Sequence, residues 1–217
     1  MLLARRCPVC DRRGAAPCAG CIDELEPPPR RPPPLGVDRL AAPFAYVGAG
    51  RELVARLKYR NARSAVPWLA AAMATRVEPV GLRVVTWVPT TAKRRRSRGY
   101  DQAEVLARSV ARRLGLPCRP LLRRQPGPAQ TGRPLEQRRT GPRLRAPSRD
   151  AVPDAVLLVD DVVTSGATLA AAALALRAAG AKRVDAVTAA STPLKMTLTV
   201  AERHANGTGN RRYTSSR

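Results

Sequence analysis

Aromatic side chains and histidines are scarce in this chain. Two Trp, four Tyr and one Phe make up 3% of the 217 residues. So few rings disfavour an OB or RRM fold, because those folds stack nucleic-acid bases on several exposed aromatic side chains. His204 is the sole histidine and lies in a polar tail, which excludes Ser-His-Asp and Cys-His catalysis.

Acidic residues and long apolar runs are also few. Lys and Arg number 39 against 16 Asp and Glu, for a net charge of +23. This surplus favours polyanionic partners such as phosphates, nucleic acid or anionic lipid, without choosing among them. There is no apolar run of about 18 residues, and the N-terminus lacks the apolar core of a secretory signal. We therefore expect a cytoplasmic protein with no membrane span.

Four of the five cysteines lie close together near the N-terminus, as two CxxC pairs. Each pair can present two thiolates to one tetrahedral Zn²⁺ ion, and a reducing cytosol disfavours disulfides. The spacing therefore predicts a structural zinc site; a redox pair and free thiols are the alternatives. Its ligands would be Cys7, Cys10, Cys18 and Cys21.

Composition divides the chain into four parts. Residues 1–25 form the cysteine module, and 26–40 a Pro-rich linker that contains the run EPPPRRPPP. Residues 41–200 have enough apolar surface for a folded domain, since 44% of the whole chain is hydrophobic. Residues 201–217 are polar and rich in Gly and Asn, which predicts a disordered tail.

Hydrophobic periodicity predicts an α/β domain. Strand, helix and strand follow one another after residue 155, which is typical of a right-handed βαβ unit with a parallel sheet. The residues after the strand at 84–88 predict a basic loop, and 117–150 predict a long mobile loop. The expected strands are 44–47, 84–88, 155–159 and 184–190, and the expected helices are 52–59, 64–76, 101–114 and 168–179.

The most informative stretch is VLLVDDVVTSGAT, residues 156–168. Its apolar strand places Asp160 and Asp161 near a carboxyl end, where open α/β sheets bind ligands. The following turn leads into a helix, whose N-terminal amides and neighbouring hydroxyls favour a phosphate. A ribose 5-phosphate suits both features, with its phosphate at Thr164, Ser165, Gly166, Ala167 and Thr168.

Other proteins also place acids after an apolar strand. A Walker B strand would require a GxxxxGK[ST] loop, which the chain lacks. A receiver domain needs roughly 120 residues after its acids, and only about 60 follow here. An ordinary strand–turn–helix with a charged edge is the remaining alternative.

The stretch resembles the phosphoribosyl pyrophosphate signature of type I phosphoribosyltransferases. The order of further motifs resembles one branch of them, the ComF family, also called GntX-like or competence-protein-F-like. Besides the CxxC pairs, these motifs are Leu57-Lys58-Tyr59, Val88-Pro89, the run from Arg98 to Ala103, Gln130, Leu135 and Arg138-Arg139.

The resemblance implies a type I phosphoribosyltransferase fold, with a central, mostly parallel sheet flanked by helices. It implies that Mg²⁺ binds with the sugar diphosphate, close to Asp160 and Asp161. It also places pyrophosphate in the loop that contains Thr91, Ala92, Lys93 and Arg94. Residues 124–139 correspond to a flexible loop that closes over the substrate, with Arg124 and Arg138 at family-like positions.

Two functions follow from the resemblance. In the first, the protein binds phosphoribosyl pyrophosphate or a ribose 5-phosphate ligand with Mg²⁺ and transfers the phosphoribosyl group. In the second, it is a single-stranded-DNA-handling accessory factor in DNA uptake during natural competence, and the pocket is sensory or non-catalytic. The zinc module and the basic segments 93–98 and 119–149 would then bind phosphate backbones without reading sequence.

Overall fold

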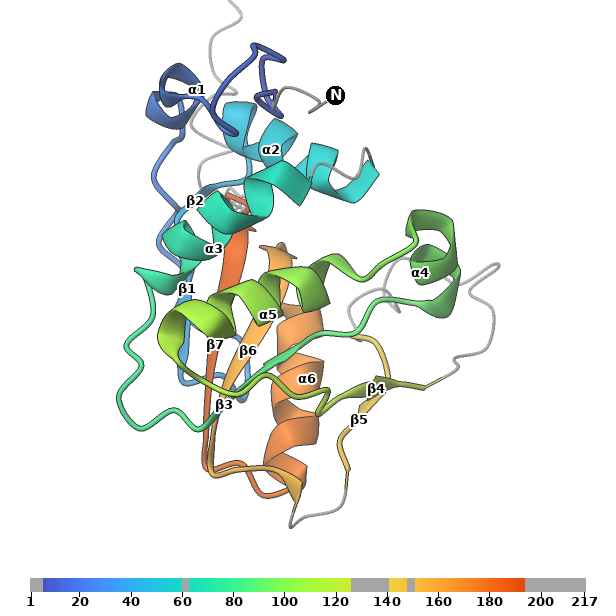
Figure 1. Ribbon diagram of the computed structural model, residues 1–217. Helices are drawn as coiled ribbons and strands as arrows, with labels where there is room; N and C mark the ends of the chain where they lie inside the picture. The colour runs from blue at the N-terminus through green and yellow to red at the C-terminus, as the bar shows by residue number, and fades with distance from the viewer. Residues whose placement is uncertain (1–5, 60–62, 126–140, 148–150, 194–217) are drawn as a thin grey trace, which may run out of the picture.

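The computed structural model describes residues 6–59, 63–125, 141–147 and 151–193 (Figure 1). Within these ranges, no helix is both long enough and apolar enough to cross a membrane.

A parallel sheet forms the centre of the molecule. Its strands lie in the order β1 (Arg39–Ala41), β7 (Arg183–Ser191), β6 (Ala155–Val163) and β3 (Val84–Trp87). A short strand, β2 (Phe44–Ala45), pairs with the end of β7, beyond β1. All these pairings are parallel, so the carboxyl ends of the strands meet at one edge, where Trp87 pairs with Val159.

Helices cover both faces of the sheet (Figure 1). Side chains of α2 (Gly48–Tyr59), α3 (Val66–Ala74) and α5 (Gln102–Leu114) pack on one face, where they meet alternate strand residues such as Leu157. α6 (Ala167–Ala178) packs on the other face. β6 can serve two cores because successive strand side chains point to opposite faces, so its first five residues are all buried.

The predicted α/β architecture is confirmed, including the parallel βαβ unit of β6, α6 and β7. Local signals set several of its boundaries. Asp101 caps the N-terminus of α5, and Gly115 ends the helix in the left-handed conformation, with φ of 67°. Glycine is favoured there because it has no Cβ to clash with the backbone.

Two loop predictions are wrong in part. The basic segment after β3 contains a helix, α4 (Ala92–Arg98), which has a Thr91 N-cap and ends at Gly99. None of the residues of α4 is buried. The helix therefore needs no apolar face, and its sequence lacks the apolar periodicity that predicts a helix. The described ends of the predicted loop at 117–150 pair as antiparallel strands β4 (Arg123–Arg124) and β5 (Leu144–Arg145).

The N-terminal residues lie against this domain. α1 (Ala19–Asp23) belongs to the cysteine module, and an extended Pro-rich segment follows it. The amide of Ala45 donates to the carbonyl of Glu26 at 2.9 Å, and the Nη1 of Arg31 donates to the carbonyl of Val163 at 3.4 Å. β1 begins within the range predicted as linker and ends at the first residue of the predicted domain, and η1 (Arg63–Ala65) leads into α3.

Candidate functional site

A cavity of about 180 Å³ opens at the carboxyl ends of β3 and β6. Arg94 and Arg98 of α4 line it. Most of the charged residues that line it come from four elements that the fold brings together: the end of β6, α4, the start of α5 and β4. The charged lining residues are Asp101, Asp160, Asp161, Arg94, Arg98 and Arg124.

Asp160 and Asp161 lie side by side in β6, where the strand emerges from the core. Both line the cavity and are half-buried. The amide of Asp161 donates to Oδ1 of Asp160 at 2.8 Å, which orients that carboxylate. Carboxylate oxygens are the ligands that Mg²⁺ prefers, so this pair is chemically suited to a Mg²⁺ ion bound with phosphates.

Asp101 adds a third carboxylate, which sequence reasoning assigned only to helix capping. Its Oδ2 accepts from the amide of Thr90 at 2.8 Å, and its Oδ1 accepts from the amide of Ala103 at 3.1 Å. Burial raises the pKa of Asp101, against the opposing effect of these amide hydrogen bonds. The carboxylate therefore fixes the segment after β3 to the start of α5 at the cavity wall.

Three arginines face these acids across the cavity. Arg124 donates from Nη1 to the carbonyl of Pro89 at 3.2 Å, so β4 is attached to the end of β3. Burial lowers the pKa of Arg124, and the positive charge of Arg94 lowers it further. Arg98 donates from Nη1 to Oε1 of Gln102 at 2.9 Å. The cavity thus places three guanidinium groups, which can attract an anionic ligand, in the same lining as three carboxylates, which can hold a cation.

The predicted phosphate-binding turn, residues 164–168, lies between the end of β6 and the first turn of α6. Thr164 and Ser165 are exposed, whereas Gly166 is buried and has a φ of 81°. Ala167 begins α6, and Thr168 lines the cavity. Within the described ranges, the amides of Thr168 and Leu169 donate to no other group, so they are available at the positive end of the helix dipole.

The other predicted site residues are placed less directly. Thr91, the N-cap of α4, accepts from the amide of Arg94 at 3.2 Å through its hydroxyl, and Ala92 and Lys93 form the first turn. None of these three belongs to the described cavity lining, although Arg94 does. Tyr100 fixes α4 in place, since its buried hydroxyl donates to the carbonyl of Leu57 at 2.5 Å. Arg138 lies outside the described residues.

The four N-terminal cysteines form a second candidate site. Their Sγ atoms all lie within 4.8 Å of one another, and those of Cys10 and Cys18 are 3.6 Å apart. A Zn–S bond of about 2.3 Å places the sulfurs of a regular tetrahedron roughly 3.8 Å apart. The cluster can therefore hold a metal ion such as zinc.

The surroundings of Cys7 favour its thiolate, whereas burial raises the pKa of Cys21. Burial raises the pKa of the Cys7 thiol, but amide hydrogen bonds, including those from Val9 and Cys18, outweigh burial and lower it to about 6. Arg56 of α2 pairs with Glu52 at 2.6 Å and with Asp11 of the module at 3.5 Å. The module is thus docked on the helical layer.

Comparisons with known proteins match a family model to the part of the chain that contributes most of the cavity lining. Residues 101–202 match the family model of the phosphoribosyl transferase domain. That match includes Asp101, β4, the two aspartates of β6 and the turn before α6. No curated protein matches the chain.

Solved structures give a partial likeness. One is glutamine phosphoribosylpyrophosphate amidotransferase from B. subtilis, complexed with ADP and GMP, and another is an allosteric regulatory enzyme of purine biosynthesis. Each is 26% identical, with a TM-score of 0.41 over 58% of this chain, which spans 26% of the length of either protein. The chain thus carries a domain of the phosphoribosyl transferase type, on an α/β fold with a parallel central sheet and an N-terminal four-cysteine cluster.

Proposed function

We propose that the protein binds phosphoribosyl pyrophosphate, or a related ribose 5-phosphate ligand, in the cavity at the ends of β3 and β6. One observation carries the proposal. The same cavity joins consecutive aspartates at a strand end to Thr168, in the first turn of a helix whose free amides are available to a phosphate. The family match over residues 101–202 supports it.

Each charged group then has a distinct role. The turn at residues 164–168 holds the 5-phosphate, while Asp160 and Asp161 face the ribose hydroxyls. The same two aspartates would hold Mg²⁺ with the diphosphate, and a bound Mg²⁺ ion neutralises phosphate charge. Arg94, Arg98 and Arg124 lie where they can stabilise a departing pyrophosphate, since preorganised cations favour charge that develops in the transition state.

We further propose that the cavity supports transfer of the phosphoribosyl group, in a member of the ComF family with a structural Zn²⁺ ion on Cys7, Cys10, Cys18 and Cys21. The approach of Arg94 and Arg124 to one cavity supports transfer, because both cations would face the leaving group. The motif order and the thiol cluster support membership of that family.

Calorimetric binding of phosphoribosyl pyrophosphate with Mg²⁺ tests the proposal. The wild type should bind, and the double variant Asp160→Asn/Asp161→Asn should bind at least about tenfold more weakly, since each charged hydrogen bond contributes about 1.5–3 kcal/mol. Asp154→Asn is a matched control, because Asp154 lies at the opposite end of β6 in an exposed pair with Lys182. Equal binding by the wild type and the double variant would contradict the proposal.

A second candidate function is binding of single-stranded DNA. α4 has no buried residue, and its exposed Lys93, Arg95 and Arg96 form a positively charged surface beside the cavity. Such binding would weaken steeply as salt rises, because each neutralised phosphate releases counterions. The triple variant Lys93→Ala/Arg95→Ala/Arg96→Ala should lower the salt slope of DNA binding and leave the sugar diphosphate affinity of the protein nearly unchanged.

A further inference from the structure

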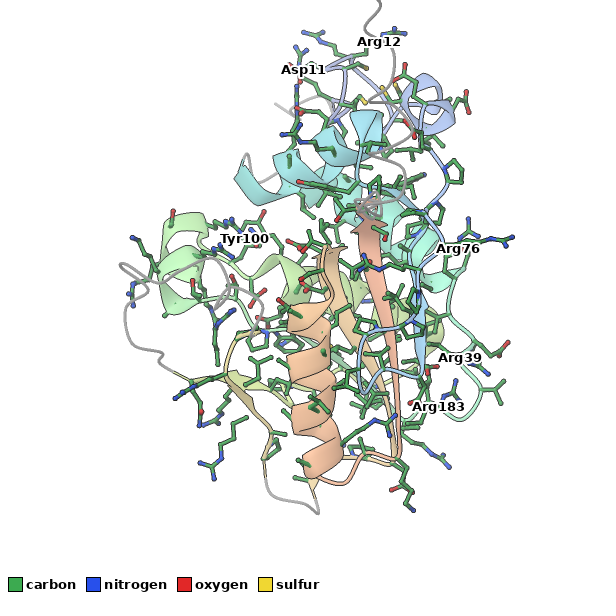
Figure 2. All side chains as sticks on the ribbon, turned by 180° about the vertical axis from the view of Figure 1, so that it is seen from behind. Asp11, Arg12, Arg39, Arg76, Tyr100 and Arg183 are labelled. Atoms are coloured by element: carbon green, nitrogen blue, oxygen red, sulfur yellow. The ribbon has the colours of Figure 1, made fainter. Side chains whose placement is uncertain are left out.

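A second, larger cavity lies between the Pro-rich segment and the sheet edge. Its volume is about 350 Å³, and it is bounded by the Pro-rich segment, by β1 and by the last residues of β6 and β7. This volume falls in the range of small-molecule sites, about 300–1,000 Å³. In Figure 2, Arg76, which lines it, lies on the opposite side of the molecule from Tyr100, so this cavity is separate from the one beside α4.

Among the residues that the structure describes, two polar atoms at this cavity are buried and have no hydrogen-bond partner. They are Nε of Arg31 and Oγ of Ser191, and both residues line the cavity. Ser191 is only 2% exposed, at the carboxyl end of β7. An unsatisfied buried donor costs about 1–3 kcal/mol, so native proteins rarely keep two such groups in one place without a ligand or water to satisfy them.

The charges around the cavity are of one sign. Arg30, Arg31 and Arg76 line it, and none of the described lining residues is acidic. Burial lowers the pKa of Arg31, and no described carboxylate pairs with its guanidinium. Leu40, Ala41 and Val163 give the remaining wall an apolar character. An oxyanion on a compact apolar body would match both parts of this lining.

We propose that this cavity is a binding site for a small organic anion, whose carboxylate or phosphate group accepts hydrogen bonds from Arg31 and Ser191. A guanidinium edge and a hydroxyl are donors that suit either oxyanion. The apolar wall would hold the body of the ligand. The site is distinct from the cavity that contains Asp160 and Asp161, and the proposal does not depend on the function proposed for that cavity.

The anion site is connected to the turn before α6. Arg31 donates to the carbonyl of Val163, which directly precedes that turn. A Cβ added at Gly166 would lie 2.7 Å from Cγ of Pro34, so the Pro-rich segment touches the turn itself. A ligand that orders Arg31 will therefore also restrain the residues that hold a phosphate in the first cavity, and binding at either site should strengthen binding at the other.

Calorimetry with two probes tests the site on the full chain. Benzoate presents a carboxylate and phenyl phosphate a phosphate monoester, so the stronger binder identifies the oxyanion. Ser191→Ala and Arg31→Gln should each weaken that probe roughly fivefold to tenfold, the amount expected for one hydrogen bond. Arg39→Gln, an exposed arginine on β1 outside the lining, is the matched control and should leave the affinity unchanged.

Thermal unfolding of Ser191→Ala provides a second readout. Without an anion, this variant should unfold at a higher temperature than the wild type, because it removes an unsatisfied buried hydroxyl. With the better probe at saturation, the wild type should gain more stability than the variant.

The proposal is overturned if neither probe binds saturably, or if binding does not change in Arg31→Gln and Ser191→Ala. Asp160→Asn/Asp161→Asn separates the two sites. It should weaken binding of the sugar diphosphate at least about tenfold and keep that of benzoate or phenyl phosphate at the second cavity. If the wild type binds only the sugar diphosphate, the proposal for the second cavity has failed. If it binds only the small anion, the function proposed for the first cavity has failed.

Discussion

Two helices begin at the edge of the same cavity, and their N-termini differ. In α5, the carboxylate of Asp101 occupies the cap, where it accepts from the amides of Ala103 and Thr90. In α6, Gly166 stands at the cap position and has no side chain to offer. In the described part of the chain, the side-chain contact at that end is a 3.4 Å hydrogen bond from the amide of Ala167 to the hydroxyl of Ser165.

The difference separates a structural helix start from one that can receive a ligand. The carboxylate at the start of α5 belongs to the protein itself and fixes two segments, so this helix start stabilises the fold. The start of α6 has amides that an external anion can bind, and it lacks the stabilisation that a side-chain cap would give. A phosphate can therefore supply to α6 what Asp101 supplies to α5.

Adding a side chain at Gly166, the cap position of α6, should have the largest effect. Gly166→Ala should destabilise the protein by about 1–3 kcal/mol, because alanine is strained at positive φ and its Cβ would meet Pro34. Binding of ribose 5-phosphate should fall by about tenfold or more as the turn shifts. Urea unfolding and calorimetry measure the two effects.

Gly115→Ala is the matched control for that variant. Gly115 also has a positive φ, of 67°, but a Cβ there would meet nothing within 4 Å. It should cost only the backbone strain, about 1 kcal/mol, and leave ligand affinity unchanged. Equal losses of affinity in the two variants would show that the turn before α6 has no special role in binding.

Much of the sheet could be predicted from local sequence, for identifiable reasons. Leu157 and Leu158 serve two cores from one strand, so β6 appears in the sequence as a continuous apolar run. β1 was missed because Arg39 and Leu40 are exposed or half-buried and owe their strand conformation to pairing with β7. That pairing joins residues far apart in the chain, which a local pattern cannot reveal.

Removing the carboxylate of Asp101, the cap of α5, should have the next largest effect. Asp101→Ala loses the cap of α5 and leaves the half-buried amide of Thr90 without this acceptor, which should destabilise the protein by about 1–2 kcal/mol. Urea unfolding measures this loss. Asp23→Ala is a suitable control, since Asp23 is exposed at the end of α1. A stability equal to that of the wild type would contradict the structural role of Asp101.

Removing a single hydroxyl should have a smaller effect, and it distinguishes ligand binding at α6 from helix capping at α4. Thr168→Val should weaken ribose 5-phosphate roughly fivefold, the value of one hydrogen bond, with little change in stability. Thr91→Val should instead lower stability by about 1 kcal/mol, because the Thr91 hydroxyl caps α4. The opposite pattern in calorimetry and unfolding would contradict the assignment of ligand binding to α6.

The candidate site was only partly predictable from the sequence. Asp160, Asp161 and Thr168 stand within one short motif, so a single strand–turn–helix places them together. Asp101 and Arg98 reach the same cavity from another element, and their part in it depends on how α4 and α5 pack. A capping pattern at Asp101 was visible, but its burial beside the cavity was not.

The smallest effect is the change in stability with pH that the carboxyl group of Asp101 causes. Burial raises the pKa of Asp101 in the folded protein above its ordinary value, so the folded state holds this proton more tightly than the unfolded state does. This contribution to stability is fully present below the ordinary carboxyl pKa and is lost as pH rises through the raised value. The wild type should therefore lose unfolding free energy over this acidic range relative to Asp101→Asn, which has no proton to release. Parallel urea titrations at several acidic pH values measure that difference, and a constant offset between the two proteins would show that the carboxylate of Asp101 is stabilised as well in the folded state as in water.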